Sequence, residues 1–196
     1  MKFNIGLVIV FLTLSCSDTN HDENMDKSKI DENTIIRIQK GKELAMKAGN
    51  ELMANLTLAI AEKGTVNALE FCATKAIDLT DSISNELGAY LRRVSDKNRN
   101  LNNAANAQEL SYILKAKKTL NSGGDVKPQL TQVGTKSIGY YPIITNSLCM
   151  QCHGDPSTEI EEETLRRIDS LYRDDKARGY DVNELRGIWV VEMSHE

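Results

Sequence analysis

The sequence predicts an α+β domain in which helices flank and interrupt a small, mostly antiparallel sheet. Apolar residues recur at three- and four-residue steps over a long early stretch, as in amphipathic helices. Short apolar runs bounded by glycine and asparagine follow, as is typical of strands. Further helical segments interrupt these runs, so both kinds of element are expected to share one core.

The first half of the folded part is expected to be mainly helical. The periodic pattern predicts a long N-terminal helix over residues 33–63, which Gly64 ends. Thr65 is a plausible cap for a second helix that runs to about Leu79. Residues 87–96, LGAYLRRVSD, then indicate a strand, followed by an asparagine-rich loop.

The second half is expected to contain three helices and three strands. The predicted helices are an amphipathic one over residues 107–120, a short one after Asn146 and one within residues 158–175. The predicted strands cover residues 129–133, 137–145 and 185–193.

The first residues resemble an export signal. Lys2 precedes an apolar run over residues 5–14, which is shorter than the roughly 20 apolar residues that a membrane span needs. The run ends at Cys16 in a context that resembles a bacterial lipobox, apart from Thr13 where leucine is usual. We expect a signal peptide over residues 1–15 and a lipid anchor on Cys16, on the periplasmic side of a bacterial membrane. The alternative is ordinary secretion, with Cys16 removed or idle.

Residues 16–33 form a polar, acidic segment that is expected to be a disordered tether, because it has too little apolar surface to offset chain entropy. Residues 33–196 hold 21 basic and 22 acidic residues, so the folded part is nearly neutral. That balance excludes a basic nucleic-acid-binding surface. We expect a single domain over residues 34–196.

The stretch SLCMQCHGD carries the clearest chemical signal. On a helix, Cys149, Cys152 and His153 share one face and can address one object together. This is the pattern of c-type haem attachment, in which two thioethers fix the porphyrin and the histidine reaches the iron. Export agrees with it, because c-type haem is joined outside the bacterial cytoplasm. We therefore predict one covalent haem c, with His153 as the proximal iron ligand.

Two other uses of paired cysteines were weighed. A zinc site needs three or four protein ligands, and few are left in this chain to complete one. A haem-free thiol–disulfide protein that uses Cys149 and Cys152 is possible in an oxidising compartment, but it has no need of His153 directly after the pair. No nucleophile–base pair, phosphate loop or paired carboxylates suggest an enzyme.

The second axial ligand of the iron is left open by the residues alone. Cys72 remains after Cys16 and the motif cysteines are assigned, but its apolar face also suits a small core residue. The other candidates are Met46, Met53, Met193 and His195, or no second protein ligand. For the anionic haem propionates, the candidates are Arg92, Arg93, Arg99 and Arg186.

The order of the segments ALEFCATKA, LRRVSDKNRNLNNAANAQE, YYPIITNSLCMQCHG and ARGYDVNELRGIWVVEM resembles a family of single-haem c-type proteins with a PAS-like fold, long catalogued as a domain of unknown function. The resemblance covers roughly residues 35–193. It implies that Cys72 is the distal ligand opposite His153. It also implies a stand-alone form whose partner is a periplasmic or membrane redox or signalling protein. Electron transfer and redox or gas sensing both remain open.

Overall fold

The computed structural model describes residues 32–194 of the 196-residue chain. The predicted signal peptide 1–15, the predicted lipidation site Cys16 and nearly all of the predicted tether 16–33 lie outside the described residues. So does His195, one of the axial-ligand candidates.

The described chain is an α+β domain with a long N-terminal helix, as predicted. Its elements, in chain order, are α1 (Glu32–Thr74), α2 (Ala76–Leu87), β1 (Tyr90–Val94), the 3-10 helix η1 (Leu101–Asn103), α3 (Ala107–Asn121), β2 (Gln129–Val133), β3 (Lys136–Ile144), α4 (Ser147–His153), α5 (Glu162–Leu171) and β4 (Leu185–Ser194). The four strands form one antiparallel sheet in the order β1-β4-β3-β2. Within residues 32–194, no helix has the length and apolar character needed to cross a bilayer.

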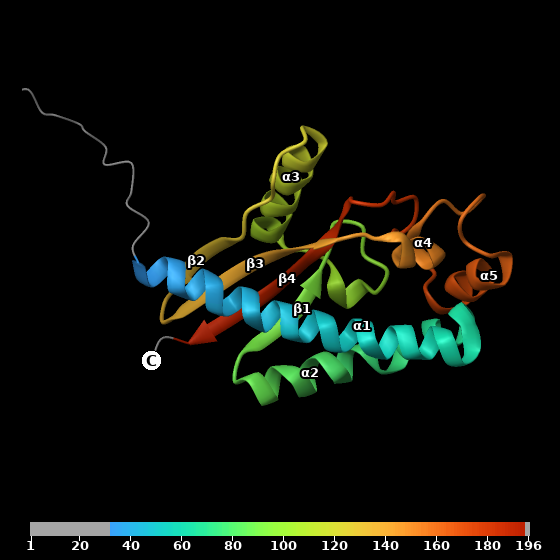
Figure 1. The fold of residues 1–196 in the computed structure, drawn as a ribbon, viewed down its shortest axis with the longest axis horizontal. Coiled ribbons are helices and arrows are strands. Elements are labelled where there is room, and N and C mark those ends of the chain that lie inside the picture. The colour runs from blue at the N-terminus through green and yellow to red at the C-terminus, as the bar shows by residue number, and fades with distance from the viewer. Residues whose placement is uncertain (1–31, 195–196) are drawn as a thin grey trace, which may run out of the picture.

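The sheet is covered on both faces, so alternate residues of each strand enter different cores. In Figure 1, α1 runs along one face and α3 rises from the other. Trp189 and Val191 of β4 pack under α1, whereas Ile188 and Val190 pack against α3. Helices α4 and α5 lie together at the far end of α1 (Figure 1). This end of the molecule holds the candidate site.

Helix α1 kinks at Lys63 and Gly64, where the sequence predicts a helix end. Gly64 has φ 76°, a left-handed conformation that favours glycine. The helical segment after the kink reaches Thr74 and carries Cys72 into the domain. In this segment, the hydroxyl of Thr65 lies 2.5 Å from the hydroxyl of Thr164, and this contact attaches the segment to α5.

Two predicted helix bounds were wrong. The second predicted helix, from Thr65 to about Leu79, is divided at Lys75: its first part ends α1 at Thr74, and α2 begins at Ala76 and runs on to Leu87, where Gly88 ends it with φ 62°. The extension is stabilised by burial, since Ile83 belongs to the core under α1. The helix expected over residues 158–175 is shorter in the structure, where α5 covers only Glu162–Leu171. The residues just before it form turns, in which backbone N–H groups donate to the carbonyl of Asp155. The strand expected over residues 87–96 is also shorter, at Tyr90–Val94, and the other predicted strands and helices are present to within two residues.

Candidate functional site

A cavity of about 280 Å³ lies between α1, α2, β1, β4 and α4. Cys72 lines it from the end of α1, and Cys149, Cys152 and His153 line it from α4. Most of the remaining wall is apolar, and includes Leu52, Leu56, Ile60, Leu69, Phe71, Ile77, Ile143, Leu148 and Trp189. The fold therefore brings together the motif and the separate cysteine that the sequence singles out.

The CMQCH motif lies on helix α4, as its spacing predicts. Asn146 caps the helix, because its Oδ1 accepts hydrogen bonds from the backbone N–H of Leu148 at 3.0 Å and of Cys149 at 3.3 Å. The two motif cysteines and His153 then face one cavity. The three cysteines that the structure describes are unpaired.

The ring of His153 is held in one orientation by the backbone. Its Nδ1 lies 2.7 Å from the carbonyl oxygen of Ala177. A carbonyl oxygen can only accept, so Nδ1 carries the proton and Nε2 keeps a free lone pair. Burial lowers the pKa of His153 well below its usual value, and the charges of Arg186 and Arg99 lower it further. His153 is therefore a neutral imidazole, which is the form of histidine that is able to bind a metal ion.

Burial has the opposite effect on the thiols. It raises the pKa of Cys72, although the charges of Arg93 and Arg99 oppose this. It raises the pKa of Cys152 to about 11, again against the charge of Arg99. In the ligand-free cavity both thiols are therefore protonated at neutral pH.

The predicted arginines divide between the two faces of the sheet. Arg93 and Arg99 line the cavity, and so does Arg186. Arg92 points to the other face and pairs with the buried Glu109 of α3. Strand alternation requires this separation, because Arg92 lies opposite Val190 and Arg93 opposite Trp189. The structure does not bring Arg92 to the cavity.

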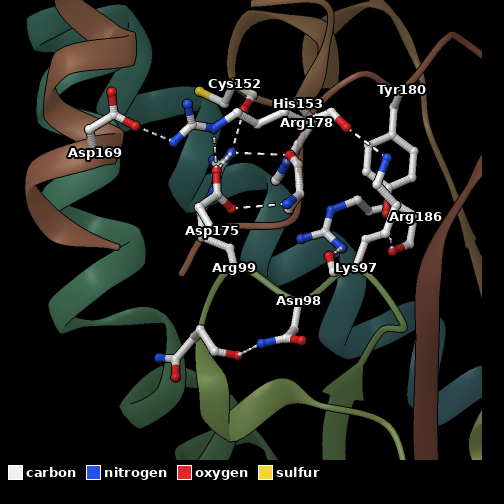
Figure 2. Close-up of polar contacts among 12 residues, drawn as sticks. Lys97, Asn98, Arg99, Cys152, His153, Asp169, Asp175, Arg178, Tyr180 and Arg186 are labelled. Carbon is white, nitrogen blue, oxygen red and sulfur yellow. Dashed lines mark hydrogen bonds and ion pairs between the residues drawn. The ribbon is translucent and has the colours of Figure 1, made fainter. Parts of the chain in front are cut away.

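The cavity arginines differ in their partners. Arg99 is committed to Asp175 and to backbone carbonyls (Figure 2). Arg93 lies 5.6 Å from the centre of the Trp189 ring and donates a long hydrogen bond of 3.5 Å to the carbonyl of Ala76. Among residues 32–194, no carboxylate pairs with Arg93 or Arg186. The Nε of Arg186 is buried without any hydrogen-bond partner.

The structure also places the other ligand candidates. Met53 lines the cavity but is 37% exposed, whereas Met46 is 54% exposed and does not line it. Met193 packs at the margin of the core under α1. Trp189 is both buried in the core and part of the cavity wall.

Sequence reasoning missed the loop that supports the histidine. Ala177 contributes only its backbone carbonyl, which leaves no trace in the sequence. Asp175 is 1% exposed and accepts hydrogen bonds from Arg99 and Arg178. It lies in a run of charged residues, RDDKAR, that gives no sign of which member is buried.

Three comparisons with known proteins bear on this arrangement. No curated protein matches the chain. Among solved structures, the chain is similar to one titled "Crystal structure of the cyanobacterial heme-protein Tll0287", with a TM-score of 0.58 and 16% identity. The match covers 85% of this chain and 97% of that one, and at this identity it shows the fold. The family model described as "Tll0287-like: Tll0287" matches residues 18–194. This confirms the resemblance found in the sequence, and the chain belongs to the Tll0287-like family.

Proposed function

We propose that this protein binds a single haem in the cavity, with thioether bonds to Cys149 and Cys152 and with His153 and Cys72 as the axial ligands of the iron. The observation that carries the proposal is the convergence of Cys72 with the CMQCH motif in one mostly apolar cavity. The free Nε2 lone pair of His153 supports the proposal. So does the similarity to a solved structure whose title calls it a haem protein.

The residues present fit such a group. The apolar wall suits a porphyrin, which is flat and largely hydrophobic, and the cavity admits few competing polar groups. The buried, unpartnered Nε of Arg186 is a cost in the ligand-free cavity that an anionic carboxylate would remove. Arg93 offers a second guanidinium without a carboxylate partner in the described chain. We assign the haem propionates to this pair, ahead of Arg99, whose guanidinium is already occupied.

A bound haem would supply a one-electron couple between ferric and ferrous iron. His153 contributes a neutral imidazole in a fixed orientation, because Ala177 holds its Nδ1–H. Cys72 contributes a thiolate once its proton leaves, and Arg93 and Arg99 stabilise that charge. A thiolate donates strongly and favours the ferric state. The surrounding apolar side chains keep water away from both ligands.

The proposed setting follows from the sequence. An exported, lipid-anchored protein with one haem suits electron transfer at the periplasmic face of a membrane, or redox or gas sensing with a partner protein. Binding of carbon monoxide by the reduced protein separates these two uses. Rapid binding with loss of the Cys72 ligand favours a sensor, and refusal favours an electron carrier.

A haem-free thiol–disulfide protein that uses the unpaired Cys149 and Cys152 is the alternative. Against it, thiol–disulfide exchange needs a thiol with a lowered pKa. Burial instead raises the pKa of Cys152 to about 11.

The proposal is tested by producing the full chain in a bacterial periplasm that contains haem-maturation machinery. We expect colour that stays with the protein in acidified organic solvent, and a ferric spectrum with a thiolate signature that Cys72→Ala abolishes. Met53→Leu is the matched control, because Met53 lines the same cavity and should leave the spectrum unchanged. Colour without any effect of Cys72→Ala would refute the distal ligand. A colourless protein with two reactive thiols in the motif would refute haem binding.

A further inference from the structure

The most densely connected side chain beside the cavity is Arg99, which lies in the loop after β1. Its Nε donates to Asp175 Oδ1 at 3.0 Å, and its Nη2 lies 3.2 Å from Asp175 Oδ2. The same Nη2 donates to the carbonyl of Cys152 at 2.6 Å and to that of Ala177 at 3.1 Å. The Arg99 side chain is 9% exposed, so these bonds are protected from competing water.

These contacts join the two segments that hold His153. Cys152 is the residue before the histidine on α4, and Ala177 receives the histidine's Nδ1–H. Figure 2 shows Arg99 and Asp175 beneath Cys152 and His153, with Arg178 on the other side of the carboxylate. The helix end and the acceptor loop are thereby fixed relative to each other by one planar group.

The carbonyl of Ala177 has a second role, because it accepts from two donors. His153 Nδ1 lies at 2.7 Å and Arg99 Nη2 at 3.1 Å from the same oxygen. A cationic donor draws electron density from the carbonyl, so the oxygen is a weaker acceptor for the imidazole N–H. A weaker bond at Nδ1 makes the ring a less basic ligand at Nε2.

From these contacts we propose that Arg99 is a positioning residue for the proximal side of the haem site, which orients His153 and limits how strongly it donates to the iron. This inference rests on the proposed function. The hydrogen bonds of its guanidinium go to Asp175, Cys152 and Ala177, so Arg99 acts on His153 through the groups that support it, and its charge also acts on Cys72.

The chain offers a matched control in Arg178. Its Nε donates to Asp175 Oδ2 at 2.6 Å and its Nη2 pairs with Asp169, but it makes no side-chain bond to Cys152 or Ala177. Arg99→Gln and Arg178→Gln each remove one positive charge and one partner of Asp175, and each leaves that carboxylate with the other arginine. Only the first variant frees the carbonyl of Ala177.

The experiment compares the haem-loaded wild-type protein with both variants by redox titration and by electron paramagnetic resonance of the ferric form. Arg99→Gln should shift the couple toward ferric by about tenfold, or ~59 mV for one electron. It should also change the ferric resonance, which responds to the orientation of the axial ligand. Arg178→Gln should change neither by a comparable amount.

Equal shifts of the potential in the two variants would overturn the proposal, because the loss of a charge near Asp175 would then explain them. The absence of any shift in Arg99→Gln would also overturn it. Arg99→Lys is compared in every case, because the charge of Arg99 also acts on Cys72, and it serves as the test variant if Arg99→Gln does not fold. Lysine keeps the charge but has no planar fork, so a wild-type potential and resonance in that variant would also overturn the proposal. If the wild-type protein itself carries no haem, the proposed function fails, and this is seen before any Arg99 variant is made.

Discussion

Protonation of His153 should destabilise the haem-free protein at mildly acidic pH. In the folded state the pKa of His153 lies well below its usual 6.5, first because the ring is buried and then because Arg186 and Arg99 repel a positive charge. The unfolded chain therefore binds a proton as pH falls through about 6.5, whereas the folded chain does not. The stabilising contribution is present above that pH and is lost below it.

The size of the effect follows from linkage. Between pH 7 and pH 5, a histidine that ionises near pH 6.5 in the unfolded chain and stays neutral in the folded chain lowers the free energy of unfolding by at most ~2 kcal/mol. His153 is half-buried and lines a cavity, so any water there screens the charge and makes this value an upper limit.

The assay is urea unfolding of reduced, haem-free protein at pH 7, 6 and 5. Trp189 reports on the transition, since it is the only tryptophan in the chain and is buried against the cavity. His153→Gln serves as the reference, because it cannot titrate in this range and shares all other groups. The free energy of unfolding of the wild type should fall relative to the variant as pH decreases. A difference that stays constant across this range would refute the reasoning.

Two further predictions concern the cavity wall. Arg186→Met removes a buried guanidinium with an unpartnered Nε, so the haem-free protein should be as stable as the wild type or more so in urea unfolding. The loaded variant should titrate at a lower midpoint potential because a cation near the iron is lost, and an unchanged potential would contradict the propionate assignment. Gly187→Ala should cost about 1–3 kcal/mol, because a Cβ there would lie 2.5 Å from the carbonyl of Val94. Gly49→Ala is its control, since a Cβ there meets only Trp189 Nε1 at 3.4 Å, and comparable losses of Tm in both would contradict this account.

Much of the fold could be predicted because local patterns determine it. The helix break at Gly64, the strands Gln129–Val133 and Leu185–Ser194, and the helix after Asn146 all follow from glycine, alternation and capping. The end of α2 could not be predicted in this way. Its extension to Leu87 depends on burial of Ile83 against the sheet, which is a property of the assembled core.

The part of the site that a sequence motif encodes could be predicted, whereas the part that depends on the positions of side chains in the folded domain could not. Cys149, Cys152 and His153 could be assigned to one face from their spacing alone. Arg92 and Arg93 are both candidates for the propionates when they are considered only as neighbouring charges. The alternation of side chains along a strand places them on opposite faces of the sheet, so only one of the two can line the cavity.

The contacts that support His153 differ from those that support Cys72. On the proximal side, Ala177, Arg99 and Asp175 form a connected network of hydrogen bonds that supports the Nδ1 side of the histidine. On the distal side, Cys72 sits on a short helical segment between the Gly64 kink and the break before α2.

That distal segment is held to α5 by side chains: Leu69 is buried in a cluster with Ile168, and the Thr65–Thr164 contact and the Glu70–Arg167 ion pair are partly exposed. A network of buried hydrogen bonds opens less readily than a short segment with partly exposed contacts. If one axial ligand leaves the iron on reduction, the structure therefore favours the loss of Cys72 over the loss of His153. Movement of Cys72 would then reach α5 through the contacts of this segment.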